Sequence, residues 1–481
     1  MTDLPESIVT ADAHGGPARL EADAIGAVQD TVIGMANSAP TVSVGLTVAG
    51  LAVTAAYAVG PVIVLTAIPM LIIANAYRRL NLWNANCGAS FQWVGRSINP
   101  YVGFLTGWLM ITGSLVGGIS GVVVLAPSVL AIFNSAANST WPNIGISTVV
   151  IVAMLVIAVV GIKITARTQV GMAAVEYVIL LGFAITGFVV VLGHRHGTFP
   201  ITSAWFSLKG IGGKGSLAAG FLTVVFMYTG WDATVYVNEE TTHRHRNPGR
   251  AAVIAVALLA VIYTVSEMGL QGVVSPARLQ ANSAAPLIYI AQSLGGGGWA
   301  KVMALSLALS VIASTGTVIV VLARMVFGMA RDRVLPPVLA QVNRRFATPV
   351  VASVVIGVIL IAATWVYLLS TSIANVFDQV IAITGLLYAG FYILTALAAV
   401  TYYRRFIFSK VSDALMVGIL PLAGAGFLVW IIYKALASAP ASEVWSVVGI
   451  VAAGVILMLV ARFVLRSPFF QLARESAAGE G

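Results

Sequence analysis

Long apolar stretches separated by short polar segments are the main pattern along the chain. A helix needs about 20 apolar residues to cross the roughly 30 Å hydrocarbon layer of a bilayer. Twelve stretches approach or exceed this length, at 24–52, 60–77, 100–133, 145–164, 170–193, 216–239, 251–274, 299–331, 349–370, 376–400, 412–434 and 443–465. The pattern predicts an all-α integral membrane protein with about 12 transmembrane helices.

The basic residues predict how these helices are oriented. Lys and Arg are enriched in cytoplasmic loops, and most of the 26 Lys and Arg residues fall on one side when the N-terminus is placed inside. We therefore expect a multi-pass protein of the cytoplasmic membrane with cytoplasmic tails at 1–23 and 467–481. Residues 1–23 lack the basic region and short apolar core of a cleaved signal peptide. The polar segment 80–99 is expected to lie along the cytoplasmic face.

The composition excludes several classes of protein. Only 9% of the 481 residues are charged, whereas a soluble domain has about 25%. The basic residues stand singly or in pairs and form no stripe for nucleic acid. We expect the lipid bilayer, and no nucleic acid, as the surrounding partner.

Metal, cofactor and enzyme chemistry are also not expected. The chain has one cysteine, Cys87, and its five histidines fall in polar segments, so neither a cysteine cluster nor an embedded haem is indicated. No nucleotide-binding loop occurs, and no catalytic set of residues lies at one depth. ATP-driven transport within this chain is therefore not predicted.

Helix-breaking residues interrupt two apolar stretches near their middle. The first stretch contains Gly34 and Pro40 on either side of 37–39, and the sixth contains Gly230 within 226–232. Proline lacks a backbone N–H and clashes with the preceding turn, and glycine weakens a helix. A kinked packing helix is the alternative for either site alone, because both residues are common in membrane spans.

The two breaks occupy corresponding places in two halves of the chain. The offset between Ser38 and Gly230 is similar to the offset between the third and eighth stretches. Matching stretches are five apart, and because five is odd the second copy enters the bilayer from the opposite side. Inverted repeats with paired broken helices are typical of secondary transporters. We expect a transporter core at 24–400, with repeats 24–193 and 216–400, and two additional helices at 412–466.

Short motifs give this prediction a family. They are NCGASFQWVGR at 86–96, GFLTGW at 103–108, GIKITAR at 161–167, FMYTGWD at 226–232, NPGR at 247–250 and RMVFGMARDRVLP at 324–336. Together they resemble the bacterial permeases of the amino acid–polyamine–organocation superfamily. The resemblance implies ten core helices in an inverted five-helix-repeat fold, with broken helices 1 and 6, plus two extra helices.

The resemblance also implies a substrate site at the two breaks. Ser38 would hold an α-carboxylate with the backbone of its neighbours, and Phe226 would close over the substrate. Trp108 would form part of the pocket wall, although packing as an aromatic core residue would account for it as well. Asp232 would bind an ammonium group or brace the break. The expected substrate-binding residues are Asn37, Ser38, Ala39, Trp108, Phe226, Tyr228, Thr229, Gly230 and Asp232.

Ionisable residues deep in a span are functional candidates. We expect Asp30, Glu176 and Arg324 to form an inner gate or a proton site. Snorkelling to the cytoplasm is the alternative for Arg324, and pairing at a helix start is the alternative for Asp30. Ser314 and Thr315 could complete a sodium site with the first break, or bond to their own helix.

These features predict a secondary permease that moves an amino acid or an amine by alternating access. The buried carboxylates Asp30, Glu176, Asp232 and Glu267 favour proton coupling and a cationic amino acid or polyamine. However, the lysine of several proton-coupled relatives is replaced by Glu176. Sodium-coupled or exchange transport of neutral amino acids, and a sensor that binds without transport, are the alternatives. A channel is disfavoured because the spans carry no rings of charge.

Overall fold

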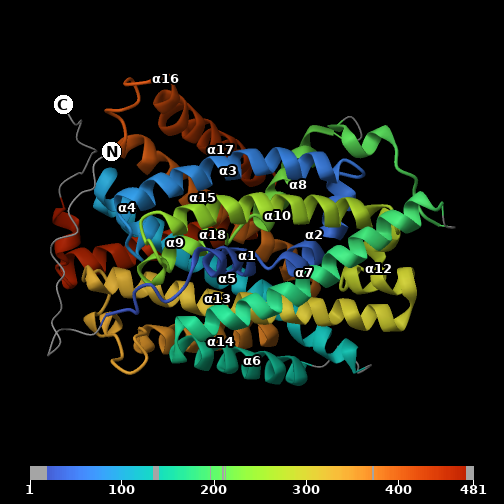
Figure 1. Cartoon of the computed structure of the whole chain (residues 1–481), viewed down its shortest axis with the longest axis horizontal. Helices are drawn as coiled ribbons and strands as arrows, with labels where there is room; N and C mark the ends of the chain where they lie inside the picture. The colour runs from blue at the N-terminus through green and yellow to red at the C-terminus, as the bar shows by residue number, and fades with distance from the viewer. Residues whose placement is uncertain are drawn as a thin grey trace.

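The computed structural model describes residues 19–133, 140–194, 197–208, 211, 213–370 and 373–472, and within that part of the chain it is helical, without strands. Eleven helical segments are long and apolar enough to cross a membrane, and a shorter apolar helix covers Leu217–Met227. Most of the long helices run along the long axis of the molecule (Figure 1). The expected all-α membrane protein is confirmed, and its sixth span is shorter than a complete crossing helix.

The helices fall into two halves with the same order. The first half consists of α1 (Ala27–Asn37), α2 (Pro40–Thr54), α3 (Val59–Trp83), α4 (Ala89–Ser97), α5 (Pro100–Ile132), α6 (Thr140–Val160) and α7 (Ile162–Leu192). The second consists of α8 (Gly213–Met227), α9 (Ala233–Tyr236), α10 (Asn247–Gln271), α11 (Pro276–Ala281), α12 (Pro286–Gly295), α13 (Gly297–Arg331), α14 (Val350–Ser370) and α15 (Ile373–Tyr402).

Equivalent helices of the two halves match in length. Helices α3 and α10 both have 25 residues, and α6 and α14 both have 21. The long helices α5 and α13 have 33 and 35 residues, and α7 and α15 have 31 and 30. The first three of these pairs also pack directly against each other. These correspondences agree with the inverted repeat predicted from the sequence.

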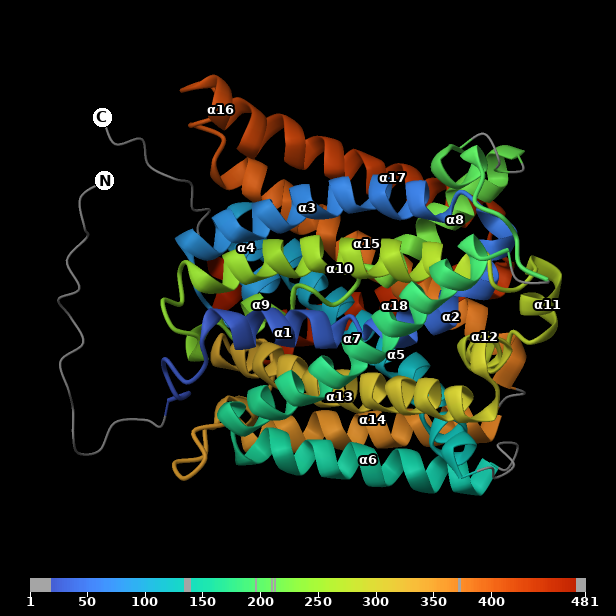
Figure 2. The ribbon, with the colours of Figure 1, turned by 45° about the vertical axis from the view of Figure 1, so that its right-hand side comes forward.

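Three further helices follow the repeats. They are α16 (Val411–Asp413), α17 (Leu420–Ser438) and α18 (Ala441–Leu459). Helix α17 packs on α15 and α3, whereas α18 packs on α5. Both lie outside the bundle that contains the breaks, as Figure 2 shows for α17. A short 3₁₀ turn at Pro468–Gln471 ends the described chain.

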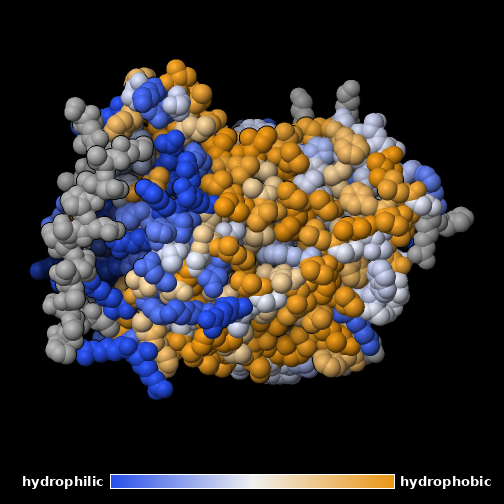
Figure 3. All heavy atoms as spheres, viewed as in Figure 1, coloured by the Kyte–Doolittle hydropathy of each residue, from blue (hydrophilic) through white to orange (hydrophobic). Residues whose placement is uncertain are grey.

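The surface carries a wide apolar band. Exposed aliphatic residues follow α6, α7 and α14, among them Val149, Val156, Val178, Val189, Val358 and Val366. Figure 3 shows the band across the middle of the molecule, with hydrophilic residues gathered at the end where Figure 1 places α4 and α9. We call this end the charged end and the opposite end, near α12, the far end. The band is what a bilayer-spanning protein requires, because lipid takes the place of water there.

The segment 80–99 contains the end of α3, which continues to Trp83, and the helix α4. Helix α4 lies at the charged end (Figure 1) and is covered by other residues. The ring of Phe469 stacks on Phe91 at 4.3 Å between centroids, and the Trp93 side chain is fully buried. The chain beyond α18 returns to cover α4, and this long-range contact leaves no signal in the local sequence.

Candidate functional site

Two spans are interrupted where the sequence predicts breaks. Between α1 and α2 the chain turns at Ala39, whose φ of 46° is left-handed. Between α8 and α9 it turns at Gly230, whose φ is 100°. Pro40 starts α2, a position that needs no backbone N–H. Both predicted breaks are confirmed.

The two breaks touch each other. The side-chain amide of Asn37 donates a hydrogen bond to the carbonyl of Gly230 at 3.1 Å. The Tyr263 hydroxyl on α10 lies 2.7 Å from the Met227 carbonyl and 3.3 Å from the Ser38 carbonyl. One tyrosine therefore contacts backbone at both interruptions. Unwound backbone is tolerated at membrane depth where such partners, or a cavity, satisfy it.

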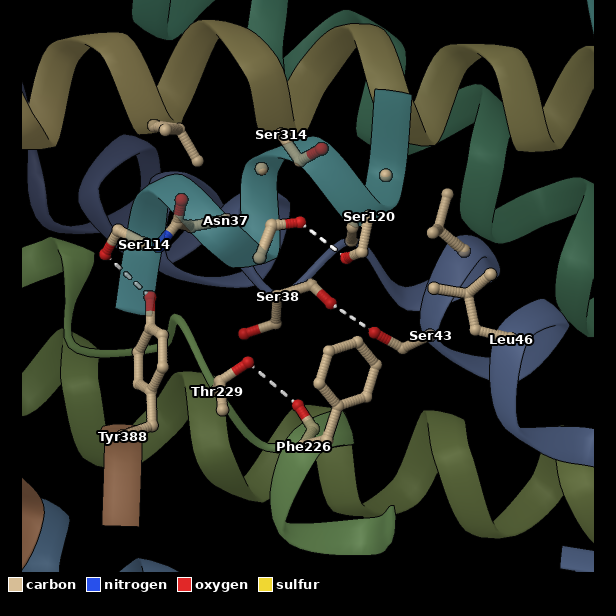
Figure 4. A pocket seen from close by; sticks show the side chains of 16 residues that line it. Asn37, Ser38, Ser43, Leu46, Ser114, Ser120, Phe226, Thr229, Ser314 and Tyr388 are labelled. Atoms are coloured by element: carbon tan, nitrogen blue, oxygen red, sulfur yellow. Dashed lines mark hydrogen bonds between the residues drawn. The ribbon is translucent and has the colours of Figure 1, made fainter. Parts of the chain in front are cut away.

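A cavity of about 40 Å³ lies beside the contact between the breaks, lined by α1, α2, α5, α8, α13 and α15. Figure 4 shows the side chains of Ser38, Thr229, Phe226 and Tyr388 around it, with Ser114 bonded to Tyr388 at 2.9 Å. Three glycines of α5 complete the wall, at 117, 118 and 121. Among the described residues that line the cavity, every polar side chain is a neutral hydroxyl or amide.

The structure places six of the predicted residues at this cavity: Asn37, Ser38, Ala39, Phe226, Thr229 and Ser314. The others lie elsewhere. The indole N–H of Trp108 donates to the carbonyl of Ile450 on α18 at 2.7 Å, so this ring faces an additional helix. Tyr228 points to the Ile63 carbonyl at 3.5 Å. Thr315 is buried away from the cavity lining.

Asp232 follows the second break and is held by α15. The Tyr392 hydroxyl donates to its carboxylate at 2.8 Å, and the Tyr392 ring stacks on Trp231 at 5.1 Å. Asp232 is buried and does not line the cavity. In this conformation the carboxylate braces the break against α15, which is one of the two roles considered for it.

The sequence did not indicate several of the residues that line the cavity. They are Val42, Ser43, Leu46, Ser114, Gly117, Gly118, Ser120, Gly121, Val318 and Tyr388. Gly117 and Gly121 are four residues apart, a spacing that predicts close helix packing, and both also form the cavity wall. Tyr388 had no signal, because only the fold brings α15 against α5.

The predicted gate residues are not joined in one hydrogen-bonded cluster within the described chain. Two of the three guanidinium nitrogens of Arg324, Nε and Nη2, donate to Glu240 at 2.8 and 2.9 Å, and both side chains are fully buried. Neither carboxylate oxygen of Asp30 has a hydrogen-bond partner among the described residues. Glu176 instead binds the first turn of α2, where Thr41 N–H donates to its Oε1 at 2.9 Å. The partner of Arg324 comes from the short turn after α9, which sequence position alone did not indicate.

A second ion pair and a partly buried acid, Asp332, lie at the charged end. Arg331 binds Glu239 at 2.7 Å, and the same carboxylate accepts the Cys87 N–H at 3.0 Å. Gln92 donates to Asp332. Burial raises the pKa of Asp332 to about 6, against the opposing charges of Arg331 and Arg96. These contacts tie α4 to the ends of α9 and α13.

Comparison with known proteins agrees with this architecture. A sequence model described as amino acid permease matches residues 29–464. The Asc-type amino acid transporter 1 of Mus musculus is 26% identical over 330 residues, covering 65% of this chain and 59% of the relative. The human protein of the same name is 30% identical over 178 residues, covering 36% of this chain and 34% of the relative.

Another relative and one solved structure extend the comparison. The large neutral amino acids transporter small subunit 2 of Mus musculus is 31% identical over 138 residues, covering 29% of this chain and 26% of the relative. The crystal structure of MhsT in complex with L-phenylalanine has a TM-score of 0.58 at 17% identity, covering 92% of this chain and 99% of that one. The structural match shows a shared fold. The chain spans no more than about three fifths of these curated relatives' lengths. Because the family match covers nearly the whole chain, this protein belongs to the amino acid permease family.

Proposed function

We propose that this chain is a secondary transporter that carries small neutral amino acids across the cytoplasmic membrane by alternating access. The observation that carries this proposal is the cavity beside the two touching breaks, whose described lining holds hydroxyls and amides but no charged side chain. A substrate ammonium group that binds the Ser38 carbonyl would replace the Ser43 hydroxyl, which donates to this oxygen at 2.7 Å. Neutral lining leaves a substrate's own opposite charges to be met by the backbone and the half-helix ends.

The neutral substrate replaces the cationic one favoured by the sequence. That preference assumed that the buried carboxylates face the substrate, but Asp30, Glu176, Asp232 and Glu267 all lie outside the cavity lining. A cationic side chain would lose its hydration and gain no counter-charge there. One relative is named for large neutral amino acids, which supports a neutral substrate and does not bear on the small size proposed below.

The size of the cavity favours a small side chain. Its volume of about 40 Å³ is little more than the space of one or two water molecules. A larger ligand would have to displace Phe226 or the α5 wall. The cavity would have to widen for any amino acid, and it would have to widen less for glycine, alanine or serine than for leucine or phenylalanine.

The backbone at the first break indicates how the carboxylate of a substrate would bind. The N–H groups of Ser38 and Ala39 are bonded to carbonyls of α1, at 3.1 Å in each case. The Ser38 hydroxyl points to the Gly34 carbonyl at 3.3 Å. Carboxylate binding would therefore exchange these local bonds for bonds to the substrate, loosening the end of α1.

Counterflow in reconstituted vesicles tests this proposal. Vesicles loaded with unlabelled alanine should accumulate labelled alanine transiently, and loading with lysine or a polyamine should not drive this accumulation. Alanine should also raise the melting temperature of the purified protein by mass action, whereas lysine should not. Stabilisation without counterflow would favour the sensor, and flux that never saturates would favour a channel. Equal counterflow with lysine would contradict the neutral substrate.

For coupling, we propose protons rather than sodium. The carboxylates of Asp30 and of Glu176, which lies beside the start of α2, have no cationic partner among the described residues. They can exchange protons as the two sides of the protein open. Ser314 donates to the Val311 carbonyl of its own helix at 3.1 Å, which favours a structural role over a sodium ligand. Uptake driven by an inside-alkaline gradient in sodium-free buffer would support this choice. Uptake that requires sodium would overturn it.

We also propose that the charged end is cytoplasmic and that the segments 1–23 and 467–481 are cytoplasmic tails. The part of the second tail that is described binds α4 and Asp332 at that end, with Ser467 donating to the Asp332 carbonyl at 2.9 Å. The division into a core at 24–400, with repeats 24–193 and 216–400, and an addition at 412–466 follows the helix correspondences.

A further inference from the structure

Glu267 is a buried carboxyl group outside the cavity, near the end of α10 that lies far from the charged end. It is 1% exposed, and its Oε1 lies 3.3 Å from the hydroxyl of Thr47 on α2. Its Oε2 has no hydrogen-bond partner among the described residues. Buried polar atoms without partners are rare in folded proteins, so this group requires an explanation.

The number of protons on the Thr47 hydroxyl supplies this explanation. A threonine hydroxyl has a single proton to donate. The carbonyl of Ser43 lies 2.6 Å from the Thr47 oxygen, much closer than Glu267, and takes that proton. The contact between Thr47 and an ionised Glu267 would then join two acceptors. A protonated Glu267 resolves the conflict, because its own O–H can donate to the Thr47 oxygen.

No cation balances Glu267 in the described part of the chain. The helices packed against α10 include α1, α2, α3, α7 and α9. Helix α2 has no titratable side chain, and the other elements, with α10 itself, contribute Asp30, Tyr77, Arg78, Arg79, Lys163, Arg167, Glu176, Tyr177, Tyr236, Arg250 and Tyr263. None of them forms an ion pair or hydrogen bond with Glu267 within the described residues, and an ionised carboxylate would stand there uncompensated.

Glu176, which lies on α7, also contacts α2 but has different partners from Glu267. Its carboxylate accepts the Thr41 N–H in the first turn of α2, and a helix N-terminus favours negative charge. The neighbouring Val42 N–H faces the Ser310 hydroxyl at 3.4 Å. One carboxylate oxygen of Glu176 therefore has a backbone N–H donor that Glu267 lacks, whereas its Oε2, like that of Glu267, has no partner among the described residues.

Glu267 is connected to the cavity through one face of α2. Thr47 donates to the Ser43 carbonyl, and the Ser43 hydroxyl donates to the Ser38 carbonyl at 2.7 Å. Ser38 and Ser43 both line the cavity. In the other direction, Gln271 lies one helical turn beyond Glu267, and neither of its buried amide atoms has a partner among the described residues. Polar contacts therefore link the cavity to Glu267, and a further buried polar side chain, Gln271, lies one turn nearer the far end of α10.

We infer that Glu267 is a proton-binding site whose state of protonation sets the hydrogen bonds of α2 at the first break. When its O–H bond breaks, the proton passes to water reached past Gln271, and the bonding electrons stay on the carboxylate. The Thr47 hydroxyl then turns from the Ser43 carbonyl to the carboxylate, which releases one bond within α2. This deepens the proposed function, on which its consequence for transport rests, although the protonation itself does not depend on transport.

Infrared spectroscopy of the purified full-length protein tests the site directly. The carbonyl stretching band of protonated carboxylic acids should be present at neutral pH and should lose intensity in Glu267→Gln. Glu176→Gln is the matched control, a buried carboxyl beside the same helix, and should keep the Glu267 intensity. Thr47→Val removes the hydroxyl at nearly constant shape and should shift the band, whereas Thr47→Ser should restore its position. An unchanged band in both Glu267→Gln and Thr47→Val would overturn the inference.

A transport measurement separates this site from the proposed function. In vesicles, Glu267→Gln should retain alanine counterflow but lose at least tenfold of the stimulation by an inside-alkaline gradient, while Thr47→Ser keeps it. Full stimulation in Glu267→Gln would overturn the coupling role. Absence of counterflow in the wild-type protein, with the infrared band still lost in Glu267→Gln, would reject the proposed function and leave the proton site standing. If Glu267→Gln does not fold, the Thr47→Val and Thr47→Ser pair decides both measurements.

Discussion

At the scale of single residues, the cavity is defined by neutral polar side chains and by glycines, which have no side chain. Hydroxyls supply its polarity, while the glycines of α5 supply its space. A Cβ atom built on Gly121 would lie 3.9 Å from the Ser314 oxygen, an ordinary contact. The position can therefore accept a methyl group without strain, at the expense of room for a substrate.

Gly121→Ala should narrow the range of substrates. The added methyl group occupies cavity space, and one methyl group in a binding pocket changes discrimination by about 1–3 kcal/mol. We expect the KM for serine to rise about tenfold and that for glycine much less. Uptake by vesicles measures both, with Gly145→Ala as control because Gly145 is exposed and has no neighbour within 4 Å of its Cβ position. Equal effects on serine and glycine would contradict a size-limited cavity at this wall.

Glu240→Gln should destabilise the protein strongly. The change leaves Arg324 fully buried without its partner charge, which costs about 3–5 kcal/mol. Glu239→Gln is the control, since the Arg331 side chain of that pair is 37% exposed, and exposed pairs contribute about 0–1 kcal/mol. Thermal unfolding of purified protein measures both. A double variant with Arg324→Met should recover much of the loss, and similar melting temperatures for the two single variants would contradict the assignment.

The sequence indicated only part of the site at this scale. Ser38, Phe226 and Thr229 were predictable because they belong to the stretches that contain helix breakers. Tyr388 and Glu240 were not, since their roles arise from contacts with α5 and α13 that only folding creates. Trp108 carried a motif signal, but it packs on α18, a helix outside the repeats.

At the scale of elements, the two interruptions determine the architecture. Gly230 takes a φ that favours glycine, and a Cβ atom there would lie 2.8 Å from backbone atoms of Asn37. Its conformation and its contact with the first break both require the absence of a side chain.

Gly230→Ala should weaken the contact between the two breaks. This effect should be larger than any effect of the change in helix propensity. The left-handed backbone costs a non-glycine residue about 1–2 kcal/mol, and the close contact with Asn37 adds to this. We expect a lower melting temperature and loss of alanine-induced stabilisation. Gly171→Ala serves as control, because its Cβ would meet nothing within 4 Å, and alanine should be neutral or favourable in that helix. A variant at 230 that binds alanine normally would rule out a required glycine.

Most elements followed from hydrophobic length, and the exceptions have physical causes. Helices α5 and α13 agree with their predicted bounds within about two residues because apolar runs of that length have few alternatives in a bilayer. The burial of α4 was not foreseen, because Phe469 reaches it from the other end of the chain.

At the scale of the whole molecule, the largest hydrophilic area lies at one end and the apolar band lies across the middle (Figure 3). Basic residues beside membrane spans remain in the cytoplasm during insertion. The orientation proposed above follows from this asymmetry, and the overall arrangement was accessible from the sequence because charge and hydropathy are read directly.

Single-cysteine labelling should establish the orientation. Cys87 is the only native cysteine and is buried, so a Cys87→Ser background allows new cysteines at exposed positions. Ser283→Cys, between α11 and α12, should react with a membrane-impermeant maleimide on intact cells. Ser409→Cys, before α16, should react only after permeabilisation. The reverse pattern would place the charged end outside.

The chain that enters α1 is joined to the chain that leaves α9. Ile25 N–H donates to the Glu240 carbonyl at 3.1 Å, and Thr242 N–H donates to the Ile25 carbonyl at 2.9 Å. These bonds resemble a short piece of sheet that fastens the roots of two half-helices together. If these bonds persist during the transport cycle, the two half-helices α1 and α9 move together as one rigid body, and the chain bends at Ala39 and Gly230. Opening toward one side would then need one coordinated rotation rather than two independent ones.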